Sequence, residues 1–172
     1  LKLIRVTTPT NMDIKSSIAP DCSPIFADAT QINQILINLC SNAVDALPIS
    51  GGRIDVTLSN TEIRPDSSQS KTTLKPGKYV ELSVKDNGSG IERSILNRIF
   101  EPYFTTKDIG KGSGIGLAVV HGIVENHGGS IVCESAEKQG TTFTILIPAY
   151  EGPANDAAGE DVIPPGNGEK IL

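Results

Sequence analysis

The sequence predicts an α/β sandwich, in which helices cover one face of a single β-sheet. Segments that alternate apolar and polar residues, as strands do, are interspersed with two segments of helical periodicity. This mixed order of helices and strands is typical of a two-layer sandwich. The chain has 172 residues, 38% of them hydrophobic, which is enough to bury one ordinary core. We therefore expect one globular domain with tails.

The N-terminal part is predicted to be extended. The stretches "LKLIRV" and "NMDIKSSI" are apolar enough to pack, while Pro9, Pro20 and Pro24 exclude a helix. We expect a strand, a loop and a second strand, and we assign residues 1–25 to a leading segment that packs on the domain.

The first helix is predicted to begin near Asp28 or Thr30, both candidate N-cap residues, and to stop at Pro48. Two strands follow, in residues 53–63 and 78–87, joined by a long polar loop.

The second helix is predicted within residues 114–129, where Gly128 and Gly129 end it. Residues 130–137 and 141–148 then form a hairpin. The remaining tail is rich in Gly, Pro, Ala and acidic residues and cannot build a core, so we interpret residues 151–172 as a linker. The apolar face of the second helix is predicted to consist of Ile115, Val119, Ile123 and Val124.

Composition limits the kinds of partner and the cellular compartment that we expect. A net charge of −5 gives no electrostatic reason to expect nucleic acid as a partner. Cys22, Cys40 and Cys133 are odd in number and lack a short paired spacing, which disfavours a disulfide framework and a zinc site and favours the cytoplasm. No apolar run approaches twenty residues and no initiator methionine is present. We expect an excised soluble piece without direct membrane contact, any membrane anchor lying elsewhere in the parent.

One face of the first predicted helix is polar but carries neither lysine nor arginine. At about 100° per residue this face collects five side chains. Exposed helix faces usually carry Lys and Glu, which have the higher helix propensity, whereas amide and carboxylate oxygens suit Mg²⁺, which takes few protein ligands. Both a solvated face and a magnesium site therefore remain open for Gln31, Gln34, Asn38, Asn42 and Asp45.

Two glycine clusters flank the second half of the domain. In "SVKDNGSGI" a strand runs into Asp86, after which glycines permit a tight turn or the close approach of a ligand to the backbone. The cluster "GKGSGIGL" opens directly into the second helix, whose N-terminal amides form an anion site. Its spacing is that of neither a Walker loop nor a dinucleotide fingerprint.

Between the clusters, the stretch "FEPYFTTKDIGKG" combines hydroxyl and cationic side chains with glycines. This composition favours a mobile lid whose cations reach a phosphate tail. The relevant side chains are Thr105, Thr106, Lys107 and Lys111.

Together these stretches resemble the catalytic, ATP-binding domain of sensor histidine kinases. In order, "NQILINLCSNAVDA", "DNGSGI", "FEPYFTTK", "GKGSGIGLAVVHGIVENHGG" and "GTTFTILIP" are similar to the asparagine box, first glycine box, phenylalanine box, second glycine box and final Gly-Thr strand of that family. The resemblance covers about residues 26–148, and we assign residues 26–150 to the ATP-binding domain. It implies the Bergerat-type ATP-binding fold shared with gyrase and heat-shock chaperone ATPases, with a mixed, mostly antiparallel sheet.

The resemblance also implies roles for single residues. Asn42 matches the ligand of Mg²⁺, Asn38 faces the phosphates, and Asp86 accepts a hydrogen bond from the adenine amino group. With Lys107, the two asparagines are the residues we expect to serve phosphoryl transfer. The residues expected to contact the nucleotide are Asn38, Asn42, Asp45, Asp86, Gly88, Gly90, Ile91, Phe100, Phe104, Thr105, Thr106, Lys107, Lys111, Gly112, Gly114, Ile115, Gly116, Leu117 and Thr141.

Asn38 separates two subclasses of this family. ATP-hydrolysing relatives carry Glu there as the general base, and an amide cannot take a proton in that role. We therefore expect transfer to a histidine on a separate dimerisation-phosphoacceptor domain, because His121 and His127 are each followed by Gly and lack the acceptor motif. The alternatives are a nucleotide-binding module without transfer activity and a serine-directed kinase of the anti-sigma-factor type.

The last residues of the chain, Lys170, Ile171 and Leu172, resemble the start of the first strand of a receiver domain. On that interpretation the parent is a hybrid histidine kinase, and the linker tethers a response-regulator receiver domain. The alternative is that these apolar residues stand at the end of the chain by chance and mark no further domain.

Overall fold

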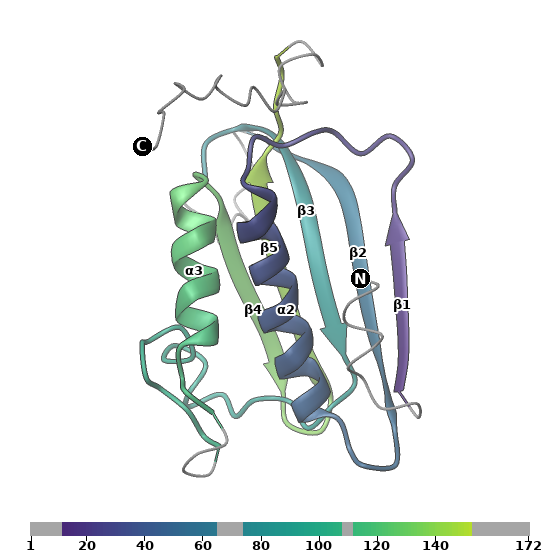
Figure 1. Ribbon diagram of the computed structural model, residues 1–172, viewed down its shortest axis with the longest axis vertical. Coiled ribbons are helices and arrows are strands. Elements are labelled where there is room, and N and C mark those ends of the chain that lie inside the picture. Colours follow the sequence, from purple (N-terminus) through teal and green to yellow (C-terminus); the bar gives the residue numbers. More distant parts are fainter. Residues whose placement is uncertain (1–11, 65–73, 108–111, 153–172) are drawn as a thin grey trace, which may run out of the picture.

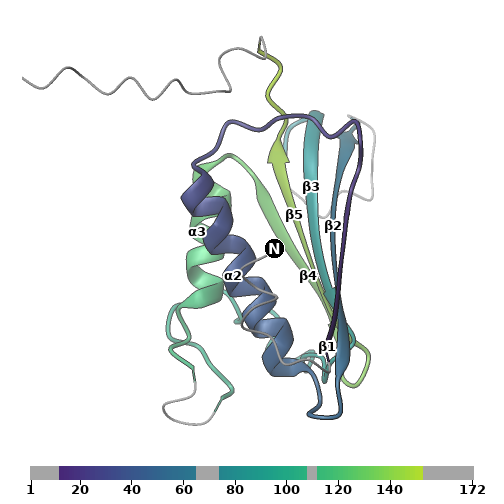
Figure 2. The same ribbon diagram turned by 45° about the vertical axis from the view of Figure 1, so that its right-hand side comes forward.

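The protein folds as a five-stranded sheet with two helices on one face. The computed structural model describes residues 12–64, 74–107 and 112–152. Figure 1 shows both helices in front of the sheet, and Figure 2 shows them on the same side of it. The predicted α/β sandwich is confirmed. Its elements are β1 (Met12–Ile18), α2 (Ala29–Ala46), β2 (Gly52–Ile63), β3 (Gly77–Asp86), α3 (Gly116–Asn126), β4 (Ser130–Ala136) and β5 (Gly140–Pro148).

The sheet is mixed and mostly antiparallel, as predicted. Its strand order is β1-β2-β3-β5-β4. The strands β1 and β2 are parallel, because α2 carries the chain back to the start of the sheet between them, while the other three pairs are antiparallel. The ends of α2 and β3 and the beginning of α3 therefore meet at one end of the molecule, the lower end in Figure 1.

Helix α2 has the boundaries that its sequence predicts. Asp28 is the N-cap residue, and its carboxylate accepts a hydrogen bond from the amide of Thr30 at 2.7 Å. The helix ends at Ala46, two residues before Pro48. The fully buried side chains of Ile35 and Leu39 lie one turn apart and face the sheet, which leaves the polar stripe on another face.

The apolar face predicted for α3 is partly wrong. The fully buried residues of this helix are Val120 and Val124, whereas the predicted Ile115 and Val119 are 41% and 36% exposed. Ile115 is the N-cap residue and lies outside the helix, so the buried stripe begins later than the glycine-rich sequence suggested. The predicted end of the helix is confirmed by Gly128, which has φ +66.

The leading segment is only partly described. The second predicted strand is confirmed as β1, whereas the first, in residues 1–6, lies outside the described residues, as do residues 153–172 of the predicted linker. The core domain ends where Ala149 forms a bridge with Ile25. Within the described part of the chain, neither helix is long and apolar enough to cross a membrane.

Candidate nucleotide-binding site

A cavity of about 530 Å³ lies where α2, the end of β3 and the segment before α3 meet. This volume falls within the range of about 300–1,000 Å³ that small-molecule sites occupy. Most of the residues predicted from the sequence surround it. These are Asn38, Asn42, Asp45, Asp86, Gly90, Ile91, Phe104, Thr105, Thr106, Lys107, Gly112, Gly114, Gly116, Leu117 and Thr141.

Three predicted residues within the described part of the chain do not line the cavity. Ile115 is the N-cap residue of α3 and is exposed, and the predicted Lys111 lies outside the described residues. Phe100 packs against Phe143, which does line the cavity. Its ring centroid lies 6.5 Å from that of Phe143 and 5.3 Å from that of His121. The backbone of Gly88 supports Asp86 instead of lining the cavity.

Asp86 is a fixed hydrogen-bond acceptor at the buried end of the cavity. Its side chain is 4% exposed, and Oδ1 accepts hydrogen bonds from the amides of Gly88 at 2.8 Å and Thr141 at 3.3 Å. Burial raises the pKa of this carboxyl, while the two amides act in the opposite direction. Because both amide bonds go to Oδ1, the second carboxylate oxygen is available to a ligand.

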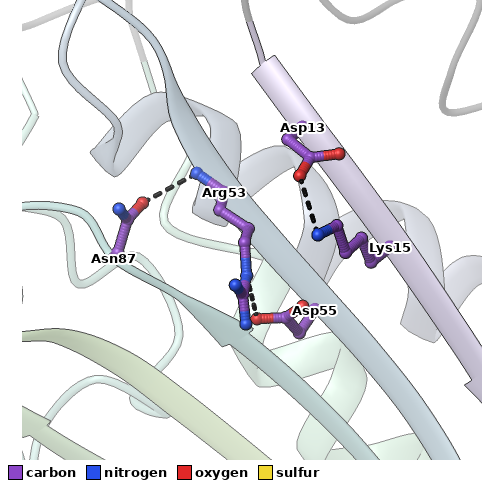
Figure 3. A network of polar contacts seen from close by, with 5 residues as sticks. All are labelled: Asp13, Lys15, Arg53, Asp55 and Asn87. Atoms are coloured by element: carbon purple, nitrogen blue, oxygen red, sulfur yellow. Dashed lines mark hydrogen bonds and ion pairs between the residues drawn. The ribbon is translucent and has the colours of Figure 1, made fainter.

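The strand end that carries Asp86 is anchored to β2 by the next residue. The side-chain oxygen of Asn87 accepts a hydrogen bond from the amide of Arg53 at 2.7 Å, and the amide of Asn87 donates to the carbonyl of Arg53 at 3.3 Å. Figure 3 shows this contact beside the ion pair of Arg53 with Asp55, which measures 2.7 Å. Asn87 therefore fixes where β3 stops and the glycine loop begins.

The glycines of the first cluster approach the protein's own backbone. Gly90 has φ +70, and a Cβ there would overlap the carbonyl oxygen of Ala136, the last residue of β4. A Cβ at Gly88 would lie 2.6 Å from the carbonyl oxygen of Ala46. Because these glycines have no side chains, the loop after β3 fits between α2 and the β4–β5 hairpin. The same lack of side chains would also leave space for a base.

The polar stripe of α2 divides into two parts. Asn38, Asn42 and Asp45 line the cavity, whereas Gln31 and Gln34 are not among the lining residues. Asn38 donates from Nδ2 to the carbonyl of Gly116 at 3.2 Å and accepts at Oδ1 from Gln34 at 3.3 Å. The half of the stripe nearer the C-terminus of α2 is thus the part that faces a ligand.

Lys107 lies beside this part of the stripe. Nζ of Lys107 lies 2.6 Å from Oδ2 of Asp45 and 3.4 Å from Oδ1 of Asn42. The hydroxyl of Thr105 accepts a hydrogen bond from the amide of Lys107 at 3.1 Å, which sets the direction of the chain there. Cationic and oxygen-bearing groups therefore meet at one side of the cavity.

The beginning of α3 supplies amides on the same side. Its N-cap residue, Ile115, makes no side-chain capping bond, unlike Asp28 at α2, and Gly116 lines the cavity. Uncapped amides at a helix N-terminus attract anions. The site thus has a buried acceptor at one end and anion-binding groups at the other, which fits a base joined to phosphates.

A divalent cation would find few protein ligands here. In residues 12–64, 74–107 and 112–152 no cluster of three or more His, Cys, Asp or Glu side chains is placed to hold a metal. Asn42 and Asp45 offer oxygens that Lys107 contacts in this structure, and Mg²⁺ is commonly held by one or two such oxygens together with phosphates and water. The donors fit a cation that arrives with the nucleotide.

Several lining residues were not predicted from the sequence. Phe143 lies two positions after Thr141 on β5, so strand alternation places both on the inner face and could have identified it. The four-residue spacing of Ile95 and Ile99 gave a weaker signal, because their segment is a series of turns rather than a helix. The other unpredicted residues are Ser41, Ala43, Ala46, Ser89 and Ser113.

Comparisons with known proteins identify the family of this chain. Residues 27–151 match the family described as histidine kinase-, DNA gyrase B-, and HSP90-like ATPase. The chain is 40% identical over 149 residues to the sensor kinase CckA of Brucella abortus (strain 2308), which covers 86% of this chain and 16% of that protein. It is 44% identical over 124 residues to the sensor histidine kinase ZraS of Escherichia coli (strain K12), covering 72% of this chain and 23% of that protein.

A solved structure gives the same result. The catalytic domain of histidine kinase ThkA, in a nucleotide-free form, superimposes with a TM-score of 0.63 and 32% identity, over 86% of this chain and 84% of that one. Our chain spans only a small part of the two curated relatives, and the part that it spans contains the whole cavity. The chain therefore belongs to the histidine kinase-, DNA gyrase B- and HSP90-like ATPase family, as an ATPase domain of the sensor histidine kinase type.

Proposed function

We propose that this domain transfers the γ-phosphoryl group of Mg-ATP to a histidine on the dimerisation-phosphoacceptor domain of its parent kinase, in two-component signal transduction. One observation carries the proposal. Among the described residues that line the cavity, the carboxylates are those of Asp45 and Asp86. Asp45 is paired with Lys107, and Asp86 is buried and bonded to two amides. In the proposed complex the remaining oxygen of Asp86 accepts from the base and Asp45 faces a cation, so neither carboxylate is left to activate water and the nucleophile comes with the partner.

The residues of the domain bind and orient the nucleotide. The free oxygen of Asp86 accepts from the exocyclic amine of adenine, while Ile91 and Phe143 provide apolar walls. The amides at the start of α3 and the ammonium of Lys107 receive the phosphates. Asn42 holds the cation, which when bound neutralises charge that develops on the phosphates.

The proposed transfer requires positioning and charge neutralisation rather than a base from this domain. A neutral imidazole nitrogen of the partner forms a bond to the γ-phosphorus as the bond from that phosphorus to the bridging oxygen of ADP breaks. ADP leaves with the bond electrons, and the imidazole releases its proton to solvent. Asn38 contributes as a neutral amide that cannot divert the reaction to water.

The partner surface is proposed at the mouth of the cavity. Tyr103 is 77% exposed, and its amide donates to the carbonyl of Gly114 at 2.9 Å, which places it next to the beginning of α3. Ile115 and Val119 are exposed on the same helix start. An exposed apolar group of this kind favours contact with a partner helix.

The test combines the chain with the phosphoacceptor domain of its parent kinase and labelled ATP. An acid-labile label on that domain, dependent on its acceptor histidine, is the expected result. An acid-stable label would indicate a serine-directed kinase. Nucleotide binding without any label on the partner would indicate a binding module that performs no transfer.

Two further assignments extend the proposal to the parent protein. The cytoplasm is supported by ATP as ligand and by three cysteines that are all free thiols, each with a pKa raised by burial, to about 11 for Cys40 and about 12 for Cys133. A receiver domain in cis remains a prediction from the sequence, since residues 153–172 lie outside the described part. The gene sequence after Leu172 tests it directly, because a receiver domain requires an acidic pocket after its first strand.

A further inference from the structure

The ammonium of Lys107 lies between two oxygens of α2. Its Nζ is 2.6 Å from Oδ2 of Asp45 and 3.4 Å from Oδ1 of Asn42, and these acceptors are three residues apart on the helix. Both acceptors line the cavity. A positive charge belonging to the protein thus stands where the site offers its oxygens to a cation.

The surroundings of Lys107 hold its side chain in this direction. The hydroxyl of Thr105 accepts from the amide of Lys107 at 3.1 Å, and the Lys107 side chain is 36% exposed. Gly112 lies beside it, because a Cβ there would come within 3.0 Å of Cδ of Lys107. A larger residue at position 112 would push against the lysine, so the missing side chain leaves room for the contact with α2.

An ammonium and a magnesium ion cannot share these oxygens. Both are hard cations that prefer carboxylate and amide oxygens, and like charges at such short range repel. Occupation of Asn42 Oδ1 and Asp45 Oδ2 by one cation therefore disfavours binding of the other.

We propose that Lys107 holds the cation position of the nucleotide-free domain and that Mg²⁺ displaces it. This inference rests on the proposed function and extends it to the order of events. Arrival of Mg-ATP frees the lysine from α2, and the freed ammonium turns to the phosphates. Asp45 is then a positioning residue, which keeps Lys107 at the cavity until nucleotide arrives.

The experiment measures cation binding without nucleotide. Mn²⁺ replaces Mg²⁺ as a spectroscopic probe. Electron paramagnetic resonance measures how much Mn²⁺ the 172-residue chain binds. We expect Lys107→Met to bind Mn²⁺ several-fold more tightly than the unmodified chain, and Asp45→Asn to bind it more weakly. Lys85→Met is the matched control, because Lys85 is an exposed lysine of β3, outside the cavity lining, and its loss changes the net charge equally.

A double variant separates competition from a general charge effect. In Asp45→Asn/Lys107→Met the gain from removing the lysine should largely disappear, since the main contact of the lysine is already lost. Equal Mn²⁺ affinity of Lys107→Met and Lys85→Met would overturn the proposal, and so would the absence of Mn²⁺ binding by every variant.

The same measurements distinguish this inference from the proposed function. Asp86→Asn should lose affinity for ATP and keep its affinity for Mn²⁺. Failure of the competition would therefore leave nucleotide binding intact, whereas unaltered ATP binding by Asp86→Asn would count against the nucleotide site itself. Circular dichroism melts establish that each variant is folded.

Discussion

The side-chain amide of Asn38 donates a hydrogen bond to the backbone carbonyl of Gly116, 78 residues further along the chain, with 3.2 Å between the two atoms. This bond joins the middle of α2 to the first residue of α3. Asn38, which the resemblance matches to the base of ATP-hydrolysing relatives, thus contributes to the arrangement of the two helices. An amide suits that contact because it donates without carrying charge.

We expect the isolated domain to hydrolyse ATP more slowly than about one turnover per second, the lower end of usual enzyme rates. Asn38→Glu should raise hydrolysis, because it supplies a base, and should lower stability, because a carboxylate cannot donate to the carbonyl of Gly116. Asn38→Gln keeps the amide and serves as the control. Release of phosphate at or above one per second by the unmodified chain would show that another residue activates water.

Asp86→Asn should weaken ATP binding. The amide can still accept at Oδ1 but would present a donor to the adenine amine, and losing a buried charge-assisted bond costs about 1.5–3 kcal/mol, or roughly 10–150-fold in Kd. Isothermal titration calorimetry measures the change. Asp55→Asn removes an equal charge from β2, away from the cavity, and should bind ATP normally. Equal affinities of the two variants would refute the role of Asp86.

The same substitution should stabilise the nucleotide-free domain at neutral pH. Burial raises the pKa of Asp86 above its ordinary value of 3.8, so ionisation of this carboxyl costs stability as the pH rises through the folded-state pKa. Asp86→Asn removes that cost. Its melting temperature should exceed that of the unmodified chain at pH 7, and the difference should shrink below pH 3.8. A lower melting temperature at pH 7 would mean that the hydrogen bonds to the carboxylate outweigh its desolvation.

Nucleotide should order the lid. The amides of Thr106 and Lys107 lie in an exposed segment with few apolar contacts, and we expect hydrogen exchange there to slow when Mg-ATP binds. Amides within β3, such as that of Val84, are buried in the sheet and provide the internal reference. Identical exchange at Thr106 and Lys107 with and without Mg-ATP would argue against a lid.

Gly90→Ala should destabilise the fold. The left-handed backbone at φ +70 costs an alanine about 1–2 kcal/mol, and the added Cβ overlaps the carbonyl of Ala136. Gly122→Ala is the contrasting variant, because a Cβ there meets nothing within 4 Å and alanine favours the helix by about 0.5–1 kcal/mol. Urea unfolding should show a loss for the first and a gain for the second. A Gly90→Ala chain as stable as the parent would contradict the described loop.

The sequence predicted most elements because their signals are local. Asp28 caps α2, the apolar alternation marks β2 and β3, and Gly128 ends α3. The face of α3 was harder to predict, since the glycine-rich start leaves few side chains to define a stripe and Ile115 lies outside the helix. A pattern of apolar residues also cannot distinguish burial in the core from exposure on a surface that meets another protein.

In the candidate site, too, local patterns predicted single residues but not the contacts between distant segments. The stripe of α2 identified Asn38, Asn42 and Asp45 by helical geometry, and the strand end identified Asp86. The partnership of Lys107 with Asp45 spans 62 residues and depends on the tertiary fold, so no local pattern contains it. The tight fit of Gly90 against Ala136 is likewise a property of two distant turns meeting.

The parallel pairing of β1 with β2 also determines how the domain would respond to a pulling force. Met12 lies opposite Gly52, at the cavity end of the sheet, whereas Pro148 and the following residues leave at the opposite end. A pull between Met12 and Gly152 would act along the strands, so that the seven register pairs of β1 and β2 resist sliding together instead of opening one after another. Tension applied at Met12 would therefore pass from the edge strand into the sheet through a stiff ladder, and force spectroscopy on chains tethered at these two residues would measure its strength.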